Sequence, residues 1–142
     1  MTDMMKPKVL FLCIQNSCRS QMAEGFLRHI AGDRFEAASA GAETTRINPA
    51  AIDVMGEIGI DISGHHSKDV AQFWGKGVRY VITVCDKTKE ACPIFPGAIW
   101  KFHWSIEDPA SVPGSDDERL AVFRRVRDEI EMRVQEFVAK EA

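Results

Sequence analysis

Two continuous runs of apolar residues occur in the chain, with almost no polar alternation inside them. The first covers residues 8–12 and reads KVLFL, and the second covers residues 79–84 and reads RYVITV. Runs of this kind, rich in β-branched and aromatic side chains, are typical of strands that are covered on both faces in a parallel sheet. Two shorter segments, residues 35–39 and 100–104, are expected to be strands as well.

Between these runs, apolar residues recur at the three- and four-residue spacing of helices. Helices are predicted over residues 20–32, 48–59, 69–74 and 120–137. The second of them starts at Asn48-Pro49, a pair that supplies a cap and a first-turn proline, and it is expected to end near Gly59. The segment 86–97 carries two prolines and mixed charges, which predicts a surface loop.

Strands that alternate with helices predict an α/β fold with a parallel sheet. We expect a three-layer sandwich with a central four-stranded parallel sheet and helices on both faces, formed by residues 1–142 as a single domain. In such sheets, ligands bind at the carboxyl ends of the strands. Cys13 and Cys85 both follow predicted strands and are therefore expected at that edge.

The composition fits one ordinary globular domain, with 45% hydrophobic and 27% charged residues in a chain of 142. A formal net charge of -3 gives no reason to expect nucleic acid or an anionic membrane as partner, so a small soluble substrate or a protein partner is favoured. The apolar run before Cys13 is too short for a signal peptide or a membrane span, which predicts a cytoplasmic protein. Because that compartment keeps thiols reduced, the four cysteines are expected to serve catalysis, redox chemistry or metal binding.

The segment from Cys13 to Ser20 lies between a predicted strand and a predicted helix. Backbone N–H groups in this position converge on an anion, and the helix N-terminus adds partial positive charge. These donors and the Arg19 guanidinium favour a thiolate at Cys13, and the guanidinium also matches two oxygens of a tetrahedral oxyanion. Asn16 suits the left-handed conformation that such a loop needs, and the Ser20 hydroxyl can donate to the thiolate. With Cys13 as nucleophile, the predicted oxyanion-binding residues are Ile14, Gln15, Asn16, Ser17, Cys18, Arg19 and Ser20.

The motif from Cys13 to Gly25, which continues from the loop as Asn-Ser-Cys-Arg-Ser-Gln-Met-Ala-Glu-Gly, resembles the arsenate reductases that share the low-molecular-weight tyrosine phosphatase fold. The resemblance covers nearly the full chain, through Ser39-Ala-Gly41, Asn48-Pro49, residues 59–63, His103-Trp104, Asp108-Pro-Ala110 and residues 123–130. It implies that fold and the reduction of arsenate to arsenite in arsenic detoxification. The side chain of Cys18 is assigned no chemistry.

Cys85 and Cys92 distinguish a reductase from a phosphatase. A phosphatase needs one nucleophilic cysteine, an arginine and a general acid, because water completes the reaction. Reducing arsenate requires two electrons, which a thiol pair delivers when it becomes a disulfide. The resemblance implies that Cys13 attacks arsenate, that Cys85 attacks the arsenylated Cys13 and releases arsenite, and that Cys92 then forms a disulfide with Cys85 that thioredoxin reduces.

Three alternatives to this reading follow from the same residues. One is a phosphatase acting on phosphotyrosine or small phosphoesters, and another is an oxyanion-binding or redox-sensing module without turnover. The third, a zinc site made by the four cysteines, is disfavoured because the spacing from Cys85 to Cys92 is wider than usual and Arg19 would have no role beside zinc thiolates. No metal or other cofactor is expected, and the chain is expected to be a monomer.

Four further residues are implied as catalytic or supporting groups. Asp108, followed by proline, matches the acid loop of the family, where the carboxyl group gives a proton to the departing oxygen or adjusts Cys13. Some relatives bind potassium beside the loop through groups that match Asn16, Glu24 and Ser39, together with an aspartate. Lys68 occupies the aligned position of that aspartate, and we expect its ammonium to replace the cation beside Glu24 and to remove the potassium dependence.

Overall fold

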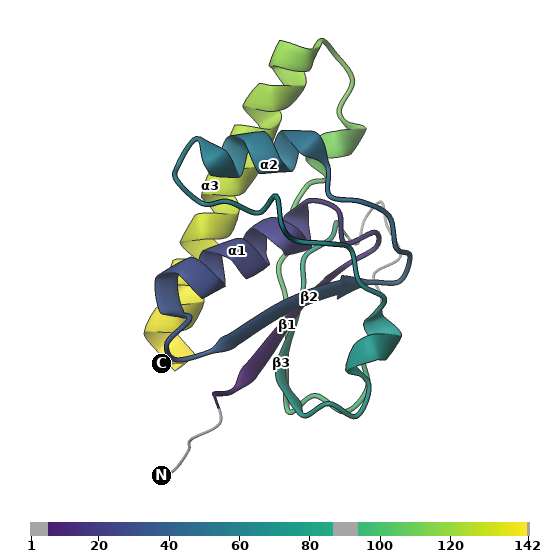
Figure 1. Ribbon diagram of the computed structural model, residues 1–142, viewed down its shortest axis with the longest axis vertical. Helices are drawn as coiled ribbons and strands as arrows, with labels where there is room; N and C mark the ends of the chain where they lie inside the picture. The colour runs from purple at the N-terminus through teal and green to yellow at the C-terminus, as the bar shows by residue number, and fades with distance from the viewer. Residues whose placement is uncertain (1–5, 87–93, 142) are drawn as a thin grey trace.

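The computed structural model describes residues 6–86 and 94–141 of the chain. It contains a four-stranded sheet in which every pair of neighbouring strands is parallel. The order across the sheet is β2-β1-β3-β4, and the strands are β1 (Lys8–Cys13), β2 (Glu36–Gly41), β3 (Val78–Thr83) and β4 (Trp100–His103) (Figure 1). The prediction of a four-stranded parallel sheet is therefore confirmed.

Four of the five described helices fall on predicted segments, and a short helix over residues 109–111 lies where none was predicted. They are α1 (Arg19–Ala31), α2 (Pro49–Gly56), α3 (Asp116–Glu141) and the 3-10 helices η1 (Val70–Phe73) and η2 (Pro109–Ser111). The Asn48 side chain caps α2 as expected, since its Oδ1 accepts a hydrogen bond from the Ala50 N–H at 2.9 Å. The helix ends at Gly56 rather than near Gly59, because the chain turns through a left-handed Gly59 with φ of 84°. None of the described helices is long and apolar enough to span a membrane.

Helices cover both faces of the sheet, as predicted, but they do so unequally. The larger core joins one face of the sheet to α1, α2 and α3, with Phe11 of β1 packed among residues such as Phe26 and Ile130. On the other face, Leu10 and Leu12 pack against the short helix η1 and the segment around Phe95. Figure 1 accordingly shows the three α-helices on one side of the sheet and η1 on the other.

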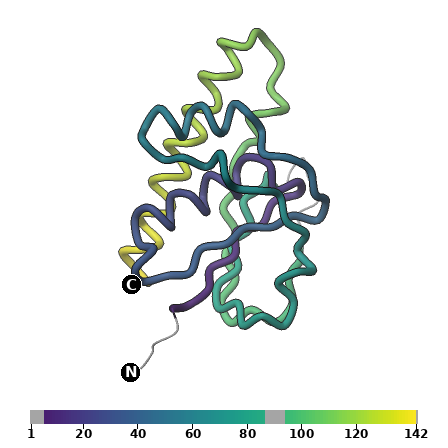
Figure 2. Tube along the Cα trace, viewed as in Figure 1, coloured from purple at the N-terminus to yellow at the C-terminus, as the bar shows by residue number. Residues whose placement is uncertain are grey.

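All four strands point the same way, so the segments that follow them meet at one edge. The Cα trace shows the loop after β1, the segment after β2 and the stretch leading to η2 gathered at this end (Figure 2). Cys13 is the last residue of β1, and the ladder with β3 continues past the strand ends, where the Val84 N–H donates to the Leu12 carbonyl at 2.8 Å. The fold therefore brings the predicted site residues of separate strands together.

Candidate active site

The loop after β1 wraps around the sulfur of Cys13. The Asn16 N–H donates to Cys13 Sγ with an N···S distance of 3.2 Å, and Ser20 Oγ lies 2.8 Å from the same sulfur. Asn16 has φ of 55° and is the one non-glycine residue with positive φ in the described part of the chain, which confirms its predicted left-handed conformation. Because α1 begins at Arg19, the positive end of its dipole faces the loop.

Backbone carbonyls of the loop are bound from outside by three residues of two other segments, the connection between β2 and α2 and the segment before η1. The N–H groups of Glu43 and Asn48 donate to the carbonyls of Ile14 and Ser17, each at 2.9 Å, and the Ser67 hydroxyl donates to the carbonyl of Gln15 at 2.8 Å. These bonds turn the carbonyls outward and leave backbone N–H groups to face the interior of the loop.

Gly41, at the end of β2, lets the loop pack this closely. A Cβ at this position would lie 2.7 Å from the Ile14 carbonyl oxygen and 2.9 Å from the Asn16 nitrogen, both of them backbone atoms. The sequence placed Gly41 in a motif of the resemblance but gave no reason for a glycine there. The reason is the approach of two backbone segments from different strands.

A cavity of about 140 Å³ opens over the loop, a size suited to a small oxyanion. Its lining consists of Cys13, Ile14, Gln15, Ser17, Cys18, Arg19, Asp108 and Ala110. Five of the seven predicted oxyanion-binding residues thus line it, whereas Asn16 and Ser20 are fully buried behind Cys13. The cavity combines a thiol, loop backbone and a guanidinium, which is the equipment for attack on a tetrahedral anion.

Arg19 and Asp108 both line this cavity, and their charged groups lie close together. The buried guanidinium donates through Nη1 to the Ile106 carbonyl at 3.0 Å, and its Nη2 lies 3.9 Å from Asp108 Oδ2. Asp108 also caps η2, since Oδ1 accepts from the Ala110 N–H at 3.0 Å. One carboxylate oxygen therefore fixes the turn while the other faces the arginine.

Cys18 is a neighbour of Cys13 with a different character. Burial, followed by the charges of Cys13 and Asp108, raises the pKa of the Cys18 thiol to about 12. Its sulfur donates weakly to Asp108 Oδ1 at 3.9 Å. A thiol with this pKa stays protonated at neutral pH, and a protonated thiol is a poor nucleophile.

Cys85 lies at the same edge as Cys13, two residues beyond the end of β3, and is fully buried. Cys13 and Cys18 are free thiols, whereas Cys85 is disulfide-bonded. The predicted third member of the relay, Cys92, lies outside the described residues, as does part of the predicted loop over 86–97.

Glu24, Ser39 and Lys68 gather beneath the loop, as the resemblance implied. The Ser39 hydroxyl donates to Glu24 Oε1 at 2.5 Å, and Lys68 Nζ lies 3.6 Å from the same oxygen. Burial by itself would raise the pKa of Glu24, but the hydrogen bonds from Ser39 and Arg28 and the charge of Lys68 outweigh it and hold the pKa below 4.5. Glu24 is therefore a buried carboxylate with cationic partners. Among the described residues, no cluster of three or more histidine, cysteine or acidic side chains is placed to hold a metal ion.

Gln21, Arg28 and His65 extend this polar layer, and sequence reasoning assigned them no role. Gln21 Nε2 donates to Asn16 Oδ1 at 2.9 Å, and His65 Nδ1 lies 3.0 Å from Gln21 Oε1. The position of Gln21 directly after Arg19-Ser20, inside the loop motif, was the one available signal.

The sheet order, the loop from Cys13 to Arg19 and the opposing Asp108 define a thiol-dependent enzyme fold built around an oxyanion cradle. The model of the low molecular weight phosphotyrosine protein phosphatase family matches residues 8–141, so the chain belongs to that family.

Within the family, the relatives of this chain include proteins named arsenate reductase. The arsenate reductase of Halalkalibacterium halodurans is 45% identical over 134 residues, which cover 94% of this chain and 96% of the relative. A solved arsenate reductase in the oxidized state superposes with a TM-score of 0.81 at 36% identity, covering 97% of this chain and all of the other. A thioredoxin-dependent arsenate reductase of Corynebacterium glutamicum gives a TM-score of 0.71 at 29% identity, covering 95% of this chain and 61% of the other.

Proposed function

We propose that this protein is an arsenate reductase that converts arsenate to arsenite through a relay of Cys13, Cys85 and Cys92. The observation that carries the proposal is the position of Cys85 at the end of β3, directly beside the strand that ends in Cys13. A phosphatase of this family has no use for a second thiol there, whereas a reductase needs one. The relatives named arsenate reductase support the same assignment.

In the first step, the Cys13 thiolate attacks the arsenic atom of arsenate, which is held by loop N–H groups and the Arg19 guanidinium. An As–O bond breaks as the S–As bond forms, and Asp108 gives a proton to the departing oxygen, which leaves as water. The 3.9 Å separation of Arg19 and Asp108 supports these two roles, in which Arg19 binds arsenate and Asp108 protonates the leaving oxygen, because both groups face the same small cavity.

In the second step, Cys85 attacks the sulfur of the arsenylated Cys13. The electron pair of the S–As bond passes to arsenic, which leaves as arsenite, and a Cys13–Cys85 disulfide forms. Cys92 then attacks Cys85, which frees the Cys13 thiolate and leaves a Cys85–Cys92 disulfide. Two electrons from thioredoxin restore the dithiol. The disulfide-bonded form of Cys85 supports its part in this exchange.

Thioredoxin as the reductant is supported by the thioredoxin-dependent relative, and a cytoplasmic location fits a cycle that needs reduced thiols. We further propose that the protein acts as a monomer. Weak hydrolysis of phosphoesters is expected as a side activity, because the cradle accepts any tetrahedral oxyanion and water can replace Cys85 as the second nucleophile.

The test is a coupled assay with arsenate, thioredoxin, thioredoxin reductase and NADPH. The wild type should consume NADPH continuously and only when arsenate is present. Cys92→Ser should release one arsenite per protein and then stop with a Cys13–Cys85 disulfide, whereas Cys85→Ser should release none. Undiminished turnover of either variant would contradict the relay, and NADPH consumption without arsenate would contradict the substrate.

A further inference from the structure

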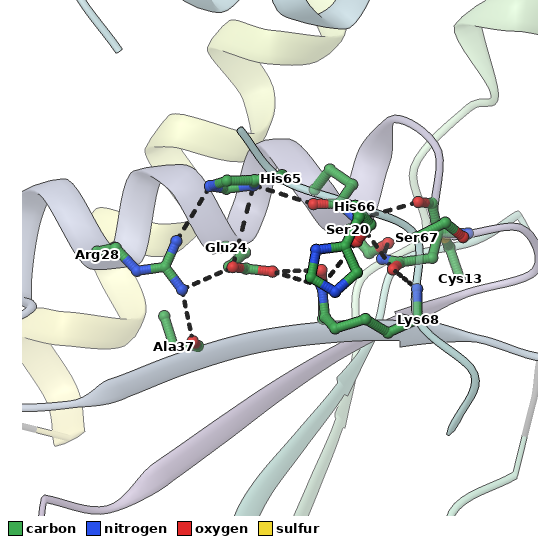
Figure 3. A network of polar contacts seen from close by, with 12 residues as sticks. Cys13, Ser20, Glu24, Arg28, Ala37, His65, His66, Ser67 and Lys68 are labelled. Carbon is green, nitrogen blue, oxygen red and sulfur yellow. Dashed lines mark hydrogen bonds and ion pairs between the residues drawn. The ribbon is translucent and has the colours of Figure 1, made fainter. Parts of the chain in front are cut away.

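A connected set of polar side chains lies beneath the Cys13 loop and reaches the surface of α1 at Arg28. Figure 3 shows Arg28, His65 and Glu24 at one end of this set and Ser20 and Cys13 at the other. Asn16, Ser20 and Gln21 are fully buried. Buried polar groups must find partners, so the direction of each hydrogen bond between them is set by its neighbours.

The orientation of the Asn16 amide follows from the backbone. The Lys68 N–H, which can only donate, lies 2.9 Å from Asn16 Oδ1 and makes that atom an acceptor. The other amide atom is therefore Nδ2, a donor, and it lies 2.8 Å from Ser20 Oγ. Asn16 thus donates to the Ser20 hydroxyl.

The orientation of Gln21 follows in the same way. Its Nε2 lies 3.1 Å from the Asn16 carbonyl and 3.0 Å from the His66 carbonyl, both of which can only accept. Nε2 also donates to Asn16 Oδ1 at 2.9 Å. Gln21 Oε1 is consequently an acceptor, and it faces His65 Nδ1.

His65 must then carry its proton on Nδ1 and accept on Nε2. The acceptor Nε2 lies 3.1 Å from Arg28 Nη1, a permanent donor. Burial, together with the charges of Arg28 and Lys68, lowers the pKa of His65 below 6.5 against the opposing effect of Glu24 and Asp61. The hydrogen bonds require a neutral His65 with its proton on Nδ1, and the lowered pKa favours the neutral ring as well.

The last link is the hydroxyl of Ser20. It accepts from Asn16, and among the described residues its own proton has one acceptor, the sulfur of Cys13 at 2.8 Å. The five bonds therefore share one direction: Arg28 to His65, His65 to Gln21, Gln21 to Asn16, Asn16 to Ser20, and Ser20 to Cys13. Bonds aligned in this way polarise one another, which strengthens the final donor.

We propose that Gln21 and His65 are positioning residues that hold this chain in one direction, so that the Ser20 proton is aimed at the Cys13 sulfur and favours the thiolate. The inference rests on the proposed role of Cys13 as nucleophile. It assigns a function to a glutamine and a histidine that touch neither the cavity nor the substrate.

The rate at which iodoacetamide alkylates Cys13 in the reduced protein tests the proposal without arsenate. The tryptic peptide 9–19 contains both Cys13 and Cys18, and tandem mass spectrometry of its fragments assigns the label to one or the other. His65→Leu should lower the rate at pH 6 by about threefold, less than the loss of one direct hydrogen bond because the effect passes through three others. His65→Gln should retain the wild-type rate, because its amide can donate to Gln21 and accept from Arg28. His29→Leu, at an exposed histidine of α1, the helix that carries Gln21, is the matched control and should not change the rate.

A double-mutant cycle makes the test specific. Gln21→Met breaks the chain closer to Cys13, so His65→Leu should have no further effect on alkylation in that background. Additive effects in the double mutant, or equal slowing by His65→Leu and His65→Gln, would overturn the proposal and indicate a general loss of packing. If alkylation behaves as expected while arsenate fails to drive NADPH consumption, the hydrogen-bond chain stands and the proposed reductase function fails.

Discussion

The ammonium of Lys68 lies 3.6 Å from the buried carboxylate of Glu24, close to the Ser39 hydroxyl that donates to the same oxygen. Lys68 Nζ also donates to the His66 carbonyl at 2.9 Å, so the cation is held from two sides. We propose that this lysine supplies a fixed positive charge at the place where the resemblance implies a potassium ion in some relatives.

We therefore expect the melting temperature and the arsenate-dependent rate of the wild type to be the same in potassium and in sodium buffers. Lys68→Ala removes one cationic partner of the buried Glu24 carboxylate and should lower the melting temperature in sodium. Potassium should restore the melting temperature of this variant. Thermal unfolding in matched chloride salts measures both effects. A wild type that is strongly stabilised by potassium over sodium would contradict this role of Lys68.

The free energy of unfolding should also decrease as the pH is lowered, because of two titratable groups in the same polar layer. Folding lowers the pKa of His65 from 6.5 and that of Glu24 from 4.5, so as the pH falls through these values each group is protonated first in the unfolded chain and only at lower pH in the folded one. The free energy of unfolding is thus expected to be highest above pH 6.5, to decline as His65 becomes protonated, and to decline again below pH 4.5. Urea titrations of the wild type and His65→Gln measure this, and the variant should lose the first decline while His29→Gln retains it.

Asp108 is expected to act in the chemical step more than in binding. Asp108→Asn keeps an oxygen that can cap η2 through the Ala110 N–H, but it has no proton to give to the leaving oxygen. The rate at saturating arsenate should fall by about 10²-fold, while the concentration for half-maximal rate changes little. A loss confined to the apparent affinity would instead make Asp108 a binding residue.

Gly41 gives a structural prediction with a matched control. Gly41→Ala forces a Cβ against the carbonyl of Ile14, and repair requires movement of the Cys13 loop, so we expect a loss of about 2 kcal/mol in unfolding free energy together with loss of activity. Gly56→Ala places a Cβ where nothing lies within 4 Å and should be neutral or stabilising by roughly 0.5 kcal/mol. Equal effects of the two substitutions on denaturant unfolding would contradict the proposed close approach.

Much of the fold could be predicted because its signals are local. The strand ending in Cys13 and the Asn48 cap of α2 are encoded in a few adjacent residues, and both are confirmed. The unequal covering of the sheet could not be predicted, because each buried strand is apolar on both faces and the sequence does not indicate on which side a helix returns.

The candidate site divides in the same manner. Cys13 and Arg19 belong to one short motif, and Asp108 became recognisable through the resemblance. The hydrogen bond between Gln21 and His65 joins positions 44 apart in sequence, and apart from the place of Gln21 inside the loop motif nothing in the sequence connects the two residues. Polar pairing over such separations leaves no periodic pattern, so the positioning residues emerge from the structure.

The small cavity over Cys13 has a consequence for selectivity. Its backbone N–H groups and its guanidinium are expected to bind phosphate as well as arsenate, because the two ions share shape and charge. Discrimination must therefore come after binding. When a second sulfur attacks, the electron pair of an S–As bond can pass to arsenic, which is thereby reduced. Phosphorus has no lower oxidation state that is accessible under these conditions. Abundant phosphate would therefore be a reversible competitive inhibitor. Whether a bound ion is reduced would depend on the redox chemistry of its central atom.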